Sequence, residues 1–217
     1  MKDIPIIHSD ADILVVNKPA GIAVQGGAGI TVTILDILAR QTGEPVFPVH
    51  RLDRDTAGLL IIARSSEAAA RVCRAMEEGS LVKSYRAVTF GTLPRDSGRI
   101  DTPAGRADNK KDARTEYAVE AACDAASLVY LTLGTGRMHQ IRSHLAGIGC
   151  PIIADDKYGD FRRNREFRSR HGIRKLQLAA VDLSVTLGGQ SLRFSIPLPE
   201  HMELCLTALG IPLPLTE

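Results

Sequence analysis

The clearest pattern along the chain is a succession of short apolar or alternating runs that glycine and proline separate. The apolar run 13–16 ends at Lys18-Pro19-Ala20-Gly21, which predicts a strand leading into a turn, because proline and glycine do not continue a strand comfortably. A continuous apolar run at 59–63 predicts a buried strand. Alternating or β-branched runs predict further strands at 82–90, 114–122, 127–133, 179–187 and 191–197. Gly188-Gly189-Gln190 predicts a hairpin between the last two.

Two other segments have the spacing of helices. Residues 31–40 form the first, and residues 65–80 form the second, with Ser66 as its N-cap and Gly79 as its stop. Because strands outnumber helices and often follow one another, the chain is predicted to be α+β, with a mixed, largely antiparallel sheet flanked by helices. We expect one domain over residues 1–217, with a mobile insertion at 98–114, since no repeat or linker marks a second domain.

Composition is that of an ordinary soluble globular protein, with 217 residues, 44% hydrophobic and 24% charged. The first twelve residues contain no long apolar run, so we expect neither a signal peptide nor a membrane span. The four cysteines are scattered without a Cys-x-x-Cys pair. This spacing argues against a disulfide framework or a structural zinc site and favours the reducing cytoplasm.

Net charge is only +2, but it is unevenly distributed. Residues 162–175, RRNREFRSRHGIRK, contain seven Arg or Lys and one acid, which gives 7 − 1 = +6. Such a patch attracts polyanions through counterion release. Taken alone, it is equally consistent with a solvated surface loop.

The most unusual stretch is His50-Arg51-Leu52-Asp53-Arg54-Asp55, because it directly precedes the predicted buried strand. A carboxylate beside a desolvated strand stays ionised only if a cation or several donors face it. An arbitrary Asp between arginines usually belongs to a surface loop whose charges satisfy one another. The neighbouring sequence changes that assessment.

HRLDRDTAGLLIIAR (50–64) resembles the signature of the RluA-type RNA pseudouridine synthases. Four other blocks are similar to motifs of that family and occur in its order. They are DILVVNKPAGIAV (12–24), KSYRAVTFG (83–91), ARTEYAV (113–119) and LGTGRMHQIRSHLAGIGCPIIADDKYG (133–159). The resemblance covers about residues 7–197, and the first and last blocks are too long to match by chance.

The resemblance implies the family's mixed-sheet catalytic fold with a central RNA-binding cleft. It implies isomerisation of uridine to pseudouridine in structured RNA, ribosomal or transfer, with neither metal nor organic cofactor. We expect a stand-alone catalytic domain without the S4 RNA-binding domain that many members carry, no membrane partner, and a monomer by default. Four positions depart from the family pattern without touching the nucleophile, and they bear on substrate choice more than on chemistry. They are Gln25, Ala57, Ala154 and Ala179.

Three residues are predicted to carry the chemistry. The resemblance gives Asp53 as the catalytic carboxylate, and the sequence leaves open whether it attacks the sugar, attacks the ring or assists a glycal route. It gives Arg142 as the fixed cation, and a helical projection places this arginine at the edge of an apolar stripe. Met138, Ile141, Leu145 and Ile148 form that stripe, with His139 and Gln140 further round. Tyr85 is predicted to stack on the flipped base or to join proton transfer.

RNA contacts are predicted from Arg51, His139, Arg162, Arg163, Arg165 and Arg168. Arg51 is a candidate to fill the space that a flipped base leaves, with a simple ion pair to Asp55 or another neighbour as the alternative. His50 and His144 are expected to be structural, and Asp155 and Tyr158 to order the loop after the helix.

Other protein classes fit less well. A protein kinase would need a Gly-rich loop and an Asp-Phe-Gly motif, and the glycines at 26–29 lack the Gly-Lys-Ser/Thr of a phosphate-binding loop. A glycoside hydrolase would need a second catalytic carboxylate. The stronger alternative is a non-catalytic RNA-binding or ribosome-assembly factor on the same fold, which would gain nothing from an acid at Asp53.

Overall fold

A computed structural model describes residues 2–27, 29–106 and 108–214 of the chain. The chain divides into two compact units, and each is described here by itself. The first unit comprises Met1–Lys83 and Ala180–Ile196, and the second comprises Ser84–Ala179 and Pro197–Glu217. The prediction of one domain over the whole chain stays a prediction.

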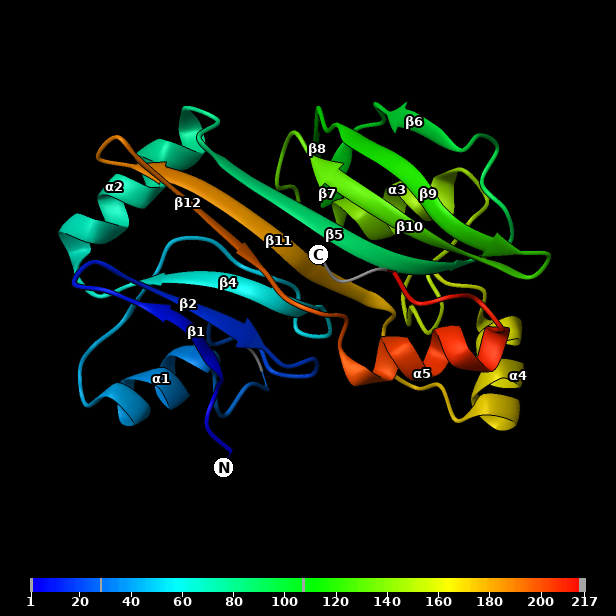
Figure 1. Cartoon of the computed structure of the whole chain (residues 1–217), viewed down its shortest axis with the longest axis horizontal. Coiled ribbons are helices and arrows are strands. Elements are labelled where there is room, and N and C mark those ends of the chain that lie inside the picture. The colour runs from blue at the N-terminus through cyan, green and yellow to red at the C-terminus, as the bar shows by residue number, and fades with distance from the viewer. Residues whose placement is uncertain (1, 28, 107, 215–217) are drawn as a thin grey trace. The chain divides into compact units, whose positions relative to one another are not determined.

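The first unit is built on a sheet whose strand order is β1-β2-β4-β11 (Figure 1). Strand β3 pairs with β4, and β12 pairs with β11. The strands are β1 (Ile6–Ser9), β2 (Ile13–Lys18), β3 (Phe47–Pro48), β4 (Ala57–Ala63), β11 (Leu178–Leu187) and β12 (Gln190–Ser195). The helices are α1 (Ile34–Thr42) and α2 (Ser66–Glu77).

The core of the first unit forms around β4, in which all seven residues are buried. Leu59, Ile61 and Ala63 project from one face of this strand and pack with Ala68 and Val72 of α2. The apolar run at 59–63 therefore correctly predicted a strand that is covered on both faces.

Gly58 lies where β4 approaches β11 most closely. Its φ is +109°, and a Cβ at this position would lie 2.0 Å from the carbonyl oxygen of Ala180. Only glycine can occupy such a position without moving the neighbouring strand. The glycine that follows the charged loop in the sequence thus has a packing role.

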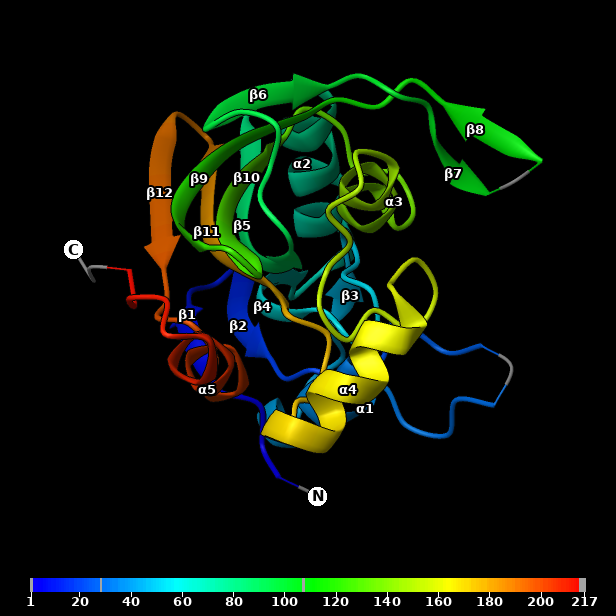
Figure 2. The ribbon, with the colours of Figure 1, turned by 90° about the vertical axis from the view of Figure 1, so that its right-hand side faces the viewer.

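The second unit contains an antiparallel sheet with the strand order β5-β10-β9-β6. Its strands are β5 (Leu81–Phe90, which begins in the first unit), β6 (Ser97–Ile100), β9 (Thr115–Cys123) and β10 (Ala126–Leu133). A separate hairpin consists of β7 (Ala104–Arg106) and β8 (Asn109–Lys111) and extends away from this sheet (Figure 2). The helices are α3 (Gln140–Gly147), α4 (Phe161–His171) and α5 (Glu200–Leu209).

The α+β prediction is confirmed, and the predicted strands and helices occur within a few residues of their expected ends. Two details were wrong. The N-cap of α2 is Ser65, whose side chain accepts a hydrogen bond from the amide of Ala68, and not Ser66. The segment 98–114, expected as a loop, contains most of β6 and the hairpin β7–β8.

The sequence of the basic segment 162–175 predicts neither a helix nor a strand, yet most of the segment forms α4. Asp160 caps this helix by accepting from the amides of Arg162 and Arg163. In the described part of the chain, no helix is long and apolar enough to cross a membrane.

Candidate active site

Asp53 lies in a short loop directly before β4 and is half-buried. Its backbone carbonyl accepts a hydrogen bond from the amide of Thr56 at 3.2 Å, which closes a tight turn. Leu52, its neighbour, is buried. The turn therefore fixes the carboxylate at the end of the most deeply buried strand of the first unit, where rigid support is available.

The buried side chain of Lys18 stabilises this loop by hydrogen bonding to its backbone. The side chain is completely buried, and its Nζ donates to the carbonyl oxygens of Ile22 at 2.8 Å, Arg54 at 2.9 Å and Pro19 at 3.0 Å. The amide of Gly21 also donates to the carbonyl of Arg54, at 2.9 Å. One ammonium thus joins the turn after β2 to the loop that carries Asp53.

Burial lowers the pKa of Lys18 to about 8, and the nearby charges of Asp55 and Asp53 act in the opposite direction. The ammonium therefore remains mostly protonated at neutral pH. Sequence reasoning missed this residue. The signal was a lysine placed at the end of an apolar strand, in the Asn-Lys-Pro-Ala-Gly turn that had already been singled out.

His50 is structural, as expected. Its Nε2 accepts from the amide of Ile61 at 3.2 Å, and burial holds the pKa of His50 well below its ordinary value. A neutral imidazole thus ties the start of the loop to the middle of β4. Arg51 is exposed, and the ion pair that Asp55 forms is with Arg54, at 3.2 Å.

Arg142 is buried in α3 of the second unit and has well-defined partners. Its Nε and Nη2 donate to the two carboxylate oxygens of Asp155 at 2.7 and 2.8 Å, and Nη2 also donates to Asp156 at 2.8 Å. The guanidinium carbon lies 5.5 Å from the centre of the Tyr158 ring. This bidentate geometry fixes the plane of the guanidinium as a lysine could not.

Asp155 is completely buried and also accepts, through Oδ1, from the amides of Lys157 and Tyr158, each at 2.8 Å. Although burial opposes ionisation, the hydrogen bonds from Arg142 and from these amides hold the pKa of Asp155 below its ordinary value. Asp155 therefore contacts the loop after α3, as predicted, through the amides of Lys157 and Tyr158. It also forms a direct ion pair with Arg142, which the sequence did not suggest.

Gln140 is a second residue that sequence reasoning missed. It was placed away from the apolar stripe, but it is buried. Its Nε2 donates to Thr115 Oγ1 at 3.0 Å and to the carbonyl of Arg114 at 2.8 Å. Its Oε1 accepts from Thr135 Oγ1 at 2.7 Å and from the amide of Arg137 at 3.1 Å. The loop before α3 is thus held by one amide side chain.

His139 occupies a left-handed conformation, with φ 54°, at the N-cap of α3. Its Nδ1 lies 3.3 Å from the hydroxyl of Tyr158, and the two rings meet edge to face at 5.6 Å. Met138, expected in the apolar stripe, is 36% exposed, because the stripe ends where the helix begins. His139 and Tyr158 therefore form an aromatic pair, and the Tyr158 ring also contacts Arg142.

Tyr85 lies on β5 opposite Leu131 of β10 and is only 5% exposed. It belongs to the second unit with Arg142, whereas Asp53 belongs to the first. The action of these three residues on one nucleotide is accordingly a proposal.

Four of the five arginines predicted to contact RNA lie on α4, but in different surroundings. Arg163 is half-buried, donates to the carbonyl of Ala125 at 3.1 Å and lies 4.2 Å from the centre of the Phe90 ring. Phe167 packs edge to face on the same ring at 4.9 Å. The remaining three are exposed: Arg162, Arg165 and Arg168.

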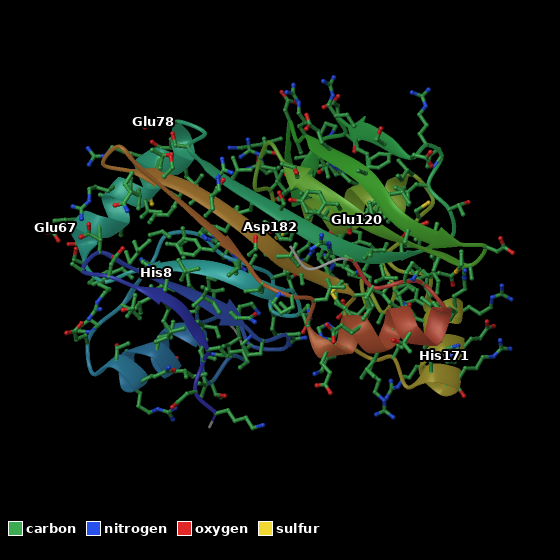
Figure 3. All side chains as sticks on the ribbon, in the orientation of Figure 1. His8, Glu67, Glu78, Glu120, His171 and Asp182 are labelled. Atoms are coloured by element: carbon green, nitrogen blue, oxygen red, sulfur yellow. The ribbon has the colours of Figure 1, made fainter. Side chains whose placement is uncertain are left out.

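All side chains of the chain's described part are drawn in Figure 3. Among them, no group of three or more His, Cys, Asp or Glu residues is arranged to hold a metal ion. The expectation that the reaction needs no cofactor stays a prediction.

Comparison with known proteins gives a consistent result. Residues 12–147 match the family model described as RNA pseudouridylate synthase. Ribosomal large subunit pseudouridine synthase C of Rickettsia conorii is 34% identical over 93% of this chain and 70% of its own length. Ribosomal large subunit pseudouridine synthase D of Nitrosomonas europaea is 33% identical over 94% of this chain and 64% of its own length. Human RNA Pseudouridylate Synthase Domain Containing 4 superposes with a TM-score of 0.83 at 27% identity, covering 97% of this chain and 94% of that structure.

Proposed function

The chain belongs to the RNA pseudouridylate synthase family, and from this premise we propose that it isomerises specific uridines of ribosomal RNA to pseudouridine. The ribosomal substrate is supported by the relatives, whose names specify the large ribosomal subunit. The names of these two relatives do not mention transfer RNA, which the sequence left open.

The observation that carries this proposal is the fixed position of Asp53. The reaction breaks the bond from uracil to C1′ of the ribose and forms a bond from C5 to the same carbon, without oxidation or reduction. Asp53 supplies the carboxylate for this exchange. Lys18 holds its loop on one side, and the loop continues directly into the buried strand β4 on the other. Little conformational entropy of the loop is therefore lost when the nucleotide binds.

Arg142 and Tyr85 complete the proposed catalytic group. Arg142 is proposed to supply a permanent positive charge at the nucleotide, and Asp155 sets the orientation of its guanidinium. Tyr85 is proposed to contact the uracil that has left its helix or to join proton transfer, through the small part of its side chain that stays accessible.

RNA binding is proposed for Arg51, His139 and the exposed arginines of α4. Arg51 is exposed two residues before Asp53, which supports the proposal that its guanidinium fills the space that the flipped uridine leaves. Arg163 differs from its neighbours, since its contacts with Phe90 and Ala125 support the helix itself.

We further propose that the protein acts as a monomer in the cytoplasm. All four cysteines are free thiols, as a reducing compartment requires.

The activity is tested by tritium release from RNA labelled at uridine C5, with total RNA from a host that lacks this gene. Wild type and Asp55→Asn should release tritium, and Asp53→Asn should not. Asp55→Asn is the matched control, because it removes the same charge from the same loop. Tight RNA binding without release by any variant would favour the non-catalytic RNA-binding factor, and equal release by Asp53→Asn would mean that another residue is the catalytic carboxylate.

The role of α4 is tested separately by the salt dependence of RNA binding. Replacement of Arg162, Arg165 and Arg168 by alanine should reduce the slope of log K against log salt by about 2–3, since each phosphate contact contributes about 0.7–0.9. An unchanged slope would show that the helix does not contact the RNA backbone.

A further inference from the structure

Lys83 differs from the buried cations Lys18 and Arg142 in its burial and in its partners. It is half-buried near the start of β5, in the first unit. The Nζ of Lys18 has three carbonyl acceptors, and the guanidinium of Arg142 has two carboxylates. Lys83, by contrast, forms no hydrogen bond or ion pair with any described residue of the chain.

The position of Lys83 follows from the alternation along β5. Leu81, two residues earlier, packs in the apolar cluster with Val49 and Ile61. Successive side chains of a strand alternate between its faces, so Lys83 projects from the same face as Leu81. His50 follows Val49 in the chain, and the charge of Lys83 is near enough to lower the pKa of that imidazole, after the larger effect of burial. Lys83 thus lies beside the start of the loop that carries Asp53.

Most of the Lys83 side chain is covered, but its Nζ does not belong to the buried polar atoms that lack a hydrogen-bond partner, so water reaches the ammonium. Burial lowers the pKa of Lys83 to about 8, which reflects the lack of any compensating partner. A partly buried ammonium without a partner in the described protein can exchange its water for an anionic group of a ligand. Met or Leu would pack on the apolar cluster without the desolvation of a charged group.

We propose that Lys83 binds a backbone phosphate of the RNA next to the uridine that is being modified. The inference rests on the proposed function, because it takes the bound polyanion to be RNA that enters beside Asp53. A lysine suits this role, since its ammonium is a compact charge that binds phosphate without demanding one orientation. Contact with the nucleotide at the catalytic loop would make Lys83 a positioning residue for the reaction.

The test compares variants in an Asp53→Asn background, in which the RNA is bound but not modified. Lys83→Met removes the charge and keeps the length of the side chain, and Lys83→Arg keeps the charge. Lys2→Met is the matched control, because it removes one charge from an exposed residue outside the proposed site. Affinity for unmodified large-subunit ribosomal RNA, transcribed in vitro, is measured over a range of salt concentrations.

Lys83→Met should reduce the slope of log K against log salt by about 0.7–0.9, the contribution of one phosphate contact. Lys83→Arg and Lys2→Met should keep the slope of the parent. Because non-specific sites on a long RNA dilute a contact made at the target, the same slope is also taken from kcat/KM of tritium release with Asp53 intact. If Lys83→Met does not fold, Lys83→Gln takes its place.

A Lys83→Met slope equal to that of Lys2→Met in both measurements would overturn the inference. An equal loss in Lys83→Met and Lys83→Arg would also overturn it, because the charge would then not be the cause. Failure of the proposed function has a different signature, namely no tritium release by wild type. If the binding slope still changes in that case, the phosphate contact holds in a protein that binds RNA without modifying it.

Discussion

Replacement of Lys18 by methionine tests whether one buried ammonium holds the loop that carries Asp53 in place. Methionine has a similar length and no donor, so the change removes three hydrogen bonds at once. The carbonyl of Arg54 keeps its hydrogen bond from the amide of Gly21. Pro19 is exposed, so water can replace the ammonium there, and the carbonyl of Ile22 is the acceptor that loses most.

An unsatisfied buried acceptor costs about 1–3 kcal/mol, and a rehydrated one costs less. We therefore expect Lys18→Met to lower the free energy of unfolding by about 2–3 kcal/mol. For a chain of this size that corresponds to a decrease in Tm of about 5–10 °C. Thermal unfolding followed by circular dichroism measures it, with Lys2→Met as the exposed control that should leave Tm unchanged.

Activity should fall further than stability alone explains. The loop that carries Asp53 loses its attachment to the turn after β2, and a misplacement of about 1 Å can reduce a rate by about 100-fold. We expect kcat for tritium release to fall by at least about 10-fold at a temperature where Lys18→Met is fully folded, with little change in RNA affinity. A variant with normal Tm and normal kcat would refute the view that Lys18 braces the loop.

The pKa of Lys18 gives the same variant a pH signature. Because the folded pKa is about 8 and the ordinary value is 10.5, the unfolded chain binds more protons than the folded one between these values. Stability contributed by Lys18 therefore rises as the pH increases through this window. The Tm difference between wild type and Lys18→Met should be larger at pH 9.5 than at pH 7, and a difference that shrinks would contradict the assigned direction.

Three other substitutions have clear expectations. Ala154→Gly should stabilise the protein by about 0.5–1 kcal/mol, because Ala154 has a φ of 60° that glycine adopts without strain; a lower Tm would contradict this. Gly58→Ala should destabilise it by more than about 3 kcal/mol or prevent folding, since the new Cβ would meet the Ala180 carbonyl at 2.0 Å; normal expression and Tm would show that the strands can separate. Arg142→Lys should reduce kcat by about 100-fold while RNA binding persists, because lysine cannot form the bidentate pair with Asp155; near-normal kcat would show that charge alone is enough.

The apolar pattern predicted the elements that carry an apolar stripe or run. The run 59–63 became β4, and the amphipathic segment 65–80 became α2, which ends just before Gly79, whose φ is 74°. Helix α4 was missed because it has no buried residue and is dominated by arginine, so it lacks the periodicity that marks a helix. Its position depends on Arg163 and Phe167 packing on Phe90, a residue far away in the sequence.

The buried polar residues of the candidate site were harder to predict for a different reason. Lys18 is satisfied by the carbonyl of Arg54, 36 positions away, and Gln140 by Thr115 and the carbonyl of Arg114, 25 and 26 positions away. A sequence shows that a residue is polar but not which backbone groups it will meet. The resemblance to a family identified Asp53 and Arg142, but it did not indicate what holds either of them in place.

Some polar side chains of the candidate site hold loops in place and others are available to bind RNA, and the acceptors that the fold supplies distinguish the two kinds. Lys18 and Gln140 each meet backbone groups of a loop without regular structure, so their polar atoms are satisfied before any RNA arrives. Such residues fix geometry, and an apolar replacement should loosen the loop without changing the charge that RNA encounters. Lys83 has no described acceptor and its Nζ is open to solvent, so in the free protein only water compensates its charge. An ammonium in that state is poised for an anion from outside, and for this reason its removal should appear in the salt dependence of binding before it appears in Tm.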